Sequence, residues 1–175
     1  MQGKFDYLSE LLKSVRKQLL DEVDALSDKQ LNQKLSEDKW SVSQVIRHLI
    51  FIDEIVLPAL KKAVQQEKSM RVVDKNIAFI LDRKNKLRSP FPDPSTVFMS
   101  KDELLKKLNH VRTPLIEYLG QLTEETVFED KSMVHPLFGP MNIKQILEFM
   151  ALHEKRHIEQ IKELKEICIR FSNRG

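Results

Sequence analysis

The chain has 175 residues, of which only four are glycine and one is cysteine, and its formal net charge is +3. This length is typical of one compact domain, so we expect a single domain over residues 1–175. Because glycine averages about 7% of residues, its scarcity argues against barrels, sandwiches and glycine-rich nucleotide-binding folds, and the single cysteine, Cys168, excludes an internal disulfide framework and a thiolate-built zinc site.

The N-terminal segment predicts a long amphipathic helix. Apolar residues recur at steps of three and four from Phe5 to Leu26, the spacing of a helix face that packs in a core. We expect this helix to run from about Lys4 to Ala25. Ser27 and Gln30 then have the spacing of a capping box, which predicts a short helical turn.

A second helix is predicted after Ser41, which has capping-box spacing to Gln44. The apolar residues that continue it are Val45, Ile46, Leu49, Ile52, Ile55 and Val56. So broad an apolar surface indicates a helix deep in the core. Pro58 lies inside this pattern, where it is expected to end the helix or to kink it, because proline removes one backbone hydrogen bond.

Two more long helices are predicted in the C-terminal half. One begins with the capping-box pair Ser100 and Glu103, and Gly120 is its expected end. The last helix is expected to begin near Asn142, whose side chain can cap it, and to run to about Arg170.

The connections are less regular. Val72 to Leu81 is compatible with a short helix, whereas the proline-rich run Ser89 to Pro94 is expected to be an extended loop. A helical turn is expected at Glu124 to Val127, and a turn of the chain is expected at His135 to Pro140. The whole pattern predicts an all-α, antiparallel four-helix bundle with a short extra helix and a proline-rich mid-chain loop.

Three histidines fall on the inward faces of the predicted helices. His153 and His157 are one turn apart in the last helix, and His48 shares the apolar face of the second. A single inward histidine is more often a core residue that bonds to a neighbour. Three of them bring several buried ring nitrogens that must be satisfied, and one divalent cation would satisfy a nitrogen of each ring. We therefore predict a shared metal site.

His153-Glu-Lys-Arg-His157 also matches the HExxH pattern of zinc peptidases. The metzincin continuation would require glycine at position 160 and histidine at 163, where this chain has Gln160 and Glu163. A downstream glutamate ligand of the other type would lie beyond residue 175. We therefore do not expect a peptidase.

The order and spacing of several motifs resemble the DinB-like superfamily, in particular its YfiT-like metal-dependent hydrolase branch. The motifs are Trp40-Ser-Val42, His48, the mid-chain proline-rich stretch, His135-Pro-x-x-Gly139 and His153-Glu-x-Arg-His157-x-x-Gln160. The resemblance covers nearly the whole chain and implies a four-helix bundle in which three histidines hold a nickel, zinc or similar divalent ion. His48, His153 and His157 occupy the corresponding positions.

The resemblance also implies an activity. Relatives include transferases that attach a low-molecular-weight thiol to electrophiles, and a thiol-dependent isomerase, so a thiol co-substrate and a small-molecule substrate are implied. Pairing as a homodimer is common in the family. Hydrolysis and thiol transfer both remain open, and so does a non-catalytic bundle that binds a metal or small ligand or serves as an interaction module with a vestigial site.

Five further residues are candidates for the surroundings of the metal. Gln160 shares the ligand face and is the first candidate partner of a ligand ring, while Gln44 lies one turn before His48 but is explained by its capping role. Glu154 is rotated by about 100° from His153, so we expect it to pair on the surface with Lys155, Arg156 or Lys162. The other two candidates are His135 and Trp40. His135 either reaches the mouth of the pocket or is an ordinary surface residue, and Trp40 either lines the pocket or is an ordinary core residue.

The remaining residues indicate a soluble, cytoplasmic protein without nucleic-acid or membrane partners. Charges throughout the first twenty residues argue against a signal peptide, and no apolar run approaches the roughly 20 residues of a membrane span. The densest basic stretch, Arg83 to Arg88, is expected to be solvated surface. We also expect His110 on the surface and Cys168 in the core.

Overall fold

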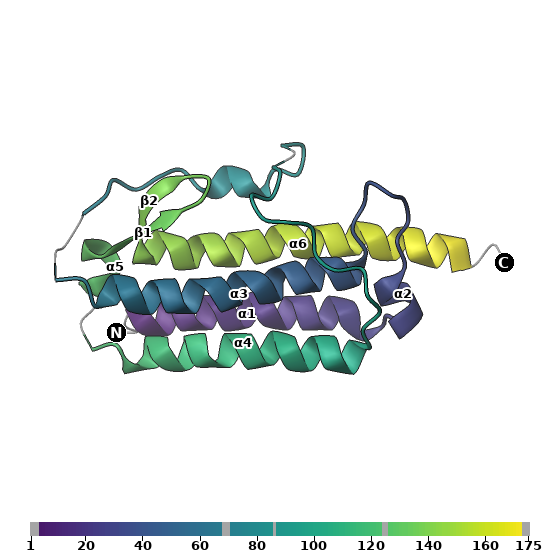
Figure 1. Cartoon of the computed structure of the whole chain (residues 1–175), viewed down its shortest axis with the longest axis horizontal. Helices are drawn as coiled ribbons and strands as arrows, with labels where there is room; N and C mark the ends of the chain where they lie inside the picture. Colours follow the sequence, from purple (N-terminus) through teal and green to yellow (C-terminus); the bar gives the residue numbers. More distant parts are fainter. Residues whose placement is uncertain (1–3, 68–70, 86, 124–125, 173–175) are drawn as a thin grey trace.

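The computed structural model describes residues 4–67, 71–85, 87–123 and 126–172, which form a bundle of four long helices (Figure 1). The long helices are α1 (Lys4–Asp24), α3 (Val42–Val64), α4 (Lys101–Gln121) and α6 (Ile143–Ser172). The shorter elements are α2 (Asp28–Asn32), the 3-10 helix η1 (Ala78–Leu81), α5 (Val127–Asp130), and the strands β1 (Ser132–His135) and β2 (Gly139–Asn142). The predicted four-helix bundle is confirmed, with a two-stranded hairpin added to it.

The helices begin where polar side chains satisfy their first backbone amides. Ser27, Ser41 and Ser100 each form a reciprocal capping box with the residue three positions later. The Asn142 Oδ1 atom accepts a hydrogen bond from the Gln145 amide at 2.8 Å, so the predicted cap of the last helix is also present.

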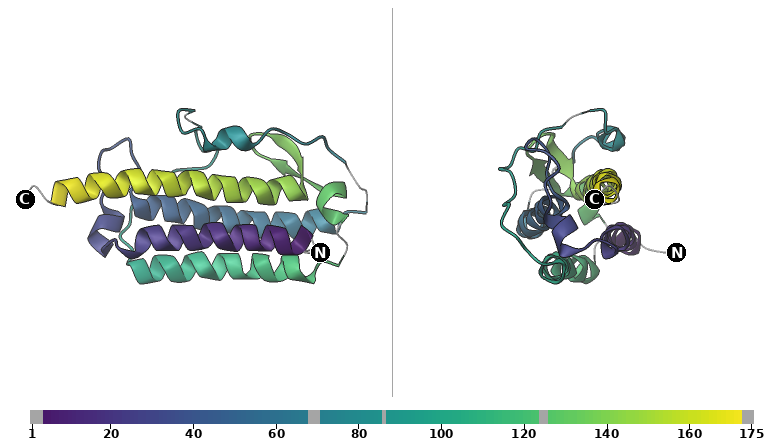
Figure 2. Two further views of the ribbon diagram at one scale, coloured as in Figure 1. Left: turned by 180° about the vertical axis from the view of Figure 1, so that it is seen from behind. Right: turned by 90° about the vertical axis from the view of Figure 1, so that its right-hand side faces the viewer.

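The four helices do not alternate strictly in direction. In Figure 1, α1 and α6 run one way along the bundle, while α3 and α4 run the other way, so α1 is antiparallel to α3 and α4 is antiparallel to α6. The end-on view in Figure 2 shows the four helices around a common axis. α3 and α4 can run in the same direction because the connection between them returns along the length of the bundle.

The hydrophobic core lies between the apolar faces of the long helices. α1 packs mainly against α6 and α3 mainly against α4, whereas α3 and α6 pack less closely against each other. The predicted face of the first helix is buried from Leu8 to Leu26, and the Phe5 side chain lies outside the described ones. Cys168 is buried in α6, as predicted. Within the described parts of the chain, no helix is both long and apolar enough to span a membrane.

Several predicted boundaries were wrong. Gly120 does not end the third long helix, which continues to Gln121 with Leu122 as its cap. Of the two effects expected of Pro58, an end to the helix or a kink in it, the first is excluded because α3 runs on to Val64. Of Val72 to Leu81, only the last four residues are helical, and before them the Lys75 backbone bonds to the Gln145 side chain of α6.

The segment before the last helix also differs from the prediction. Residues 124 and 125 of the expected helical turn lie outside the described ones, and α5 occupies Val127–Asp130 instead. The turn expected at His135 to Pro140 joins two antiparallel strands in which His135 pairs with Gly139. Gly139 has a φ of 67°, a conformation that glycine adopts without a steric penalty.

The connection between α3 and α4 is attached to both of the helices that carry the histidines. Arg156 of α6 donates hydrogen bonds to the backbone carbonyls of Ile80, Asp82 and Asn85. On the α3 side, Gln44 donates to the Pro94 carbonyl at 2.8 Å. The proline-rich run is therefore an extended loop, as predicted, and it is held against the start of α3.

Candidate metal centre

Three histidines from two helices bring their Nε2 atoms together. The Nε2 atom of His153 lies 3.3 Å from that of His48 and 3.1 Å from that of His157. One ring nitrogen from each residue lies within 4.8 Å of the others. The predicted convergence of His48 on the pair in the last helix is therefore present.

The helical phase explains this arrangement. His48 lies in the first third of α3 among its buried residues and is 5% exposed, and His157 is 8% exposed. His153 and His157 are four residues apart on α6, so their side chains lie on one face. His153 is only partly buried, so the cluster reaches solvent on its side.

All three rings favour their neutral form. Burial lowers the pKa of His48 to about 4, and burial together with the charge of His48 lowers that of His157 to about 3. Burial and the two neighbouring imidazoles place the pKa of His153 well below its ordinary value. Neutral imidazoles are the form that ligates metals.

Gln160 determines which nitrogen of His157 faces the cluster. Its Oε1 atom lies 2.8 Å from His157 Nδ1. An amide oxygen can only accept, so Nδ1 carries the proton and the lone pair of Nε2 points toward His153. Such a partner commonly orients a ligand ring and fixes its tautomer.

The cluster fits one divalent ion. Two nitrogens that are each about 2.0–2.1 Å from a tetrahedral ion lie about 3.3 Å apart, which is close to the Nε2 separations found here. An all-imidazole donor set suits zinc, nickel and similar ions. Without an ion, at most two of the three Nε2 atoms can pair with each other as hydrogen-bond donor and acceptor. A shared cation would give all three nitrogens a partner.

Aromatic rings surround the cluster on two sides. The Trp40 ring lies 5.3 Å from the His48 ring, and its Nε1 atom donates to Asp93 at 3.2 Å. On the other side Phe149 stacks against His153 with a centroid separation of 5.8 Å. Trp40 therefore contacts a candidate ligand instead of merely closing the end of the bundle.

His135 extends the second aromatic side. Its ring stacks on Phe138 and meets the edge of Phe149, with both centroid separations at 4.7 Å. Its Nδ1 atom accepts the Leu137 amide at 3.2 Å, which leaves the proton of the neutral ring on Nε2. Burial and the nearby charge of Lys75 lower the pKa of His135. The hairpin thus brings His135 over α6, near His153.

Gln44 is used elsewhere. Its Oε1 accepts the Ser41 amide at 3.1 Å and its Nε2 donates to Pro94, so both ends of its amide are engaged by the helix cap and the loop. The capping interpretation of Gln44 accounts for its contacts. Outside the site, His110 is exposed, as expected. Arg83 is less solvated than expected, because it forms a two-pronged ion pair with Glu163.

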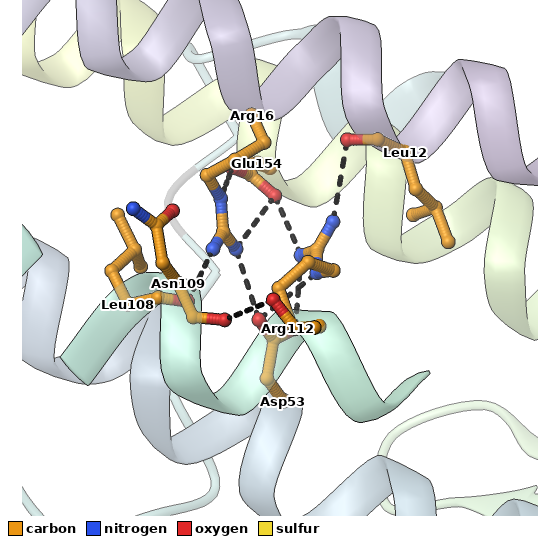
Figure 3. A network of polar contacts seen from close by, with 8 residues as sticks. Leu12, Arg16, Asp53, Leu108, Asn109, Arg112 and Glu154 are labelled. Atoms are coloured by element: carbon orange, nitrogen blue, oxygen red, sulfur yellow. Dashed lines mark hydrogen bonds and ion pairs between the residues drawn. The ribbon is translucent and has the colours of Figure 1, made fainter. Parts of the chain in front are cut away.

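The prediction that Glu154 pairs on the surface was wrong. Glu154 is 1% exposed, and its carboxylate pairs with Arg16 of α1 at 2.6 Å and with Arg112 of α4 at 2.8 Å (Figure 3). The physical reason is its helical phase: it lies four residues before the buried Ile158 and four after the buried Met150, so it points into the bundle.

The network to which Glu154 belongs was not predicted from the sequence. Asp53 of α3 completes it, with carboxylate contacts of 2.9 Å to Arg16 and 2.9 Å to Arg112. Although burial opposes the charge of Arg112, Glu154 and Asp53 outweigh it and raise the pKa of that guanidinium. The sequence does carry one signal for this network, a charged residue at a position where the helical spacing calls for an apolar one. Arg112, for example, lies between the buried Leu108 and Leu115 on the same helix face.

Comparison with known proteins identifies the family. Residues 11–161 match the sequence pattern of the DinB superfamily. The chain belongs to the DinB superfamily. The chain is also similar to YuaE of Bacillus subtilis strain 168, with 32% identity over 157 residues, which cover 89% of this chain and 96% of YuaE. A protein of Oceanobacillus iheyensis named "Putative metal-dependent hydrolase OB0413" is 23% identical over 140 residues, or 80% of this chain and 73% of that protein.

Two solved structures share the four-helix fold of this chain. YfiT from Bacillus subtilis, described as a probable metal-dependent hydrolase with an unusual four-helix bundle topology, superposes with a TM-score of 0.65 at 20% identity and covers 93% of this chain and 86% of its own. The four-helix bundle protein TT2238 gives a TM-score of 0.62 at 19% identity, covering 91% and 98%. Identities this low show the fold alone, and they bear out the YfiT-like assignment of the bundle.

Proposed function

We propose that this DinB-superfamily protein is a metal-dependent enzyme that acts on a small electrophilic substrate, by hydrolysis or by transfer of a low-molecular-weight thiol. The observation that carries the proposal is the convergence of three neutral imidazoles on one point between α3 and α6. The name "Putative metal-dependent hydrolase OB0413" and the description of YfiT as a probable metal-dependent hydrolase support the hydrolytic form.

His48, His153 and His157 would hold the ion, and we propose nickel or zinc because the donors are all imidazole nitrogens. Three protein ligands leave a coordination position open, as catalytic sites do. When bound, such an ion activates a water or a thiol as a nucleophile at neutral pH and polarises a carbonyl oxygen. The ring of His153 is the one that reaches solvent, so substrate approaches from its side.

The surrounding residues orient the substrate. Phe149 and Phe138 offer an apolar wall beside His153, and Trp40 offers another beside His48. His135 donates a hydrogen bond from Nε2 to a polar oxygen of the substrate, because its Nδ1 is occupied by the Leu137 amide. Gln160 keeps the His157 lone pair directed at the ion.

The test compares the two reactions in one protein preparation loaded with zinc or nickel. One arm follows release of nitrophenolate from a small nitrophenyl ester, which needs only water. The other adds bacillithiol, mycothiol or glutathione to a chromogenic aryl halide. The proposal is supported if turnover is lost when the metal is chelated and also in the His153→Ala variant, but is retained in His110→Ala. Metal binding without metal-dependent turnover in either arm would instead indicate a non-catalytic bundle.

A further inference from the structure

The buried charges of Arg16, Asp53, Arg112 and Glu154 link one residue from each of the four long helices (Figure 3). Each guanidinium contacts both carboxylates, so two independent bridges join Asp53 of α3 to Glu154 of α6. The remaining arginine donors bond to the backbone carbonyls of Leu108 and Leu12. We refer to these four side chains as the charge quartet.

Stability alone is a poor explanation for the charge quartet. Taking charges out of water is costly, and well-packed apolar side chains of similar volume often serve a core as well or better. What planar, two-pronged arginine pairs add is a defined geometry between their partners. All four members are at most 6% exposed, so this geometry is held within the core itself.

The two acids of the quartet lie on the helices that carry the histidines. Asp53 is five residues after His48 on α3, and Glu154 directly follows His153 on α6. α3 and α6 pack less closely against each other than each packs against its main neighbour, and the histidine cluster occupies part of their seam. Apolar packing between α3 and α6 is therefore a weak determinant of how His48 meets His153.

We propose that Arg16 and Arg112 are positioning residues for the metal centre. Reaching from α1 and α4, which contribute no candidate ligand, they hold Asp53 and Glu154 at a set separation. This fixes the spacing and axial register of α3 against α6, and with it the separation of the three imidazoles. The inference rests on the proposed metal site, but it also makes a claim about helix spacing that holds in the metal-free protein.

The decisive variant is Arg112→Lys, which keeps the charge but removes the planar fork. A second variant, Asp53→Asn with Arg112→Met, removes one charge of each sign and leaves the Arg16–Glu154 pair intact. If Arg112→Lys folds poorly, this double variant tests the same proposal in its place. Leu19→Ala is the matched control, because it opens a cavity at a fully buried α1 position without touching a charge.

Two measurements are made at a temperature where all variants are folded by circular dichroism. Nitroxide labels at Glu54 of α3 and Glu159 of α6, both exposed, report the α3–α6 distance in metal-free protein with Cys168 replaced by alanine. Titration with Co²⁺ reports affinity and the ligand-field spectrum of the site. We expect both quartet variants to broaden or shift the distance distribution and to weaken Co²⁺ binding at least tenfold, with a changed spectrum.

Leu19→Ala should retain the wild-type distance distribution and a Co²⁺ affinity within about twofold. Quartet variants that match Leu19→Ala in both measurements would overturn the positioning role. If wild-type protein does not bind Co²⁺, the proposed metal function fails, whereas the spin-label distances still decide whether the arginines set the helix spacing.

Discussion

The Nε2 atom of His48 lies 3.3 Å from the Nε2 atom of His153, although 105 residues separate them in the chain. Two neutral imidazoles at this distance cannot both present lone pairs to each other without cost, and His157 adds a third ring at 3.1 Å from His153. A shared divalent ion resolves the crowding. The proposed metal-dependent function rests on this contact, and several of its consequences can be measured.

Replacing Gln160 should weaken metal binding without unfolding the protein. Gln160→Leu removes the Oε1 acceptor from His157 Nδ1, so the ring loses its fixed tautomer. Loss of such a partner typically costs 10–100-fold in metal affinity. Gln160→Glu keeps an acceptor at the same place and should restore most of the affinity. Isothermal titration with Zn²⁺ measures both, and equal affinity in wild type and Gln160→Leu would refute the role.

Glu154 should matter more to stability than an exposed glutamate of the same helix. Glu154→Gln leaves two buried arginines with a single carboxylate, a loss we expect to lower the free energy of unfolding by about 3–5 kcal/mol. Glu159→Gln is the control, because Glu159 pairs with Lys162 at the surface, where such a pair contributes about 0–1 kcal/mol. Urea denaturation at pH 7 compares them, and equal losses would contradict the buried network.

The metal-free protein should become less stable as the pH falls from 7 to 5. The pKa of His48 in the folded state is about 4, below its ordinary value of 6.5, so the unfolded chain takes up the proton first. For His48 the loss amounts to about 2 kcal/mol between these pH values, and it ends once the pH approaches 4.

A variant separates this effect from general acid destabilisation. His48→Gln should show a smaller loss of unfolding free energy between pH 7 and pH 5 than wild type, whereas the exposed His110→Gln should match wild type. Chelator-treated, dialysed protein is required, because bound metal would stabilise the folded state. An unchanged pH slope in His48→Gln would show that His48 is not held neutral by the fold.

Gly120 and Gly139 should respond in opposite directions to replacement by alanine. Gly120 lies within α4 with open space around its Cα, so Gly120→Ala should stabilise the protein by up to about 1 kcal/mol. Gly139 has a φ of 67°, so Gly139→Ala should destabilise it by about 1–2 kcal/mol. Thermal melts of both variants provide the comparison, and a stabilised Gly139→Ala would contradict the hairpin geometry.

Much of the fold could be predicted because local signals and tertiary packing agree. The capping boxes at Ser27, Ser41 and Ser100 mark helix starts by chemistry that acts within four residues. The inward phase of His48 and of the His153–His157 pair likewise follows from helical periodicity. The hairpin was missed because strands of four residues carry little periodic signal, and β2 contains a proline.

The charge quartet was missed for a different reason. Arg16 and Asp53 occupy positions of the apolar stripe, but a charged residue in such a place is usually at the edge of the stripe and solvated. Each member of the quartet finds its partners on other helices. The partners of Arg16, for example, are 37 and 138 residues away in the sequence. Only the assembled bundle shows that the four charges neutralise one another.

The most direct test of the central claim is the metal content of untagged protein, measured by inductively coupled plasma mass spectrometry after incubation with Zn²⁺ or Ni²⁺ and gel filtration. We predict about one bound ion per chain in wild type and in His110→Ala. His48→Ala and His153→Ala should each retain almost none while remaining folded by circular dichroism. A wild type without bound metal, or equal retention in all three variants, would contradict the three-histidine centre.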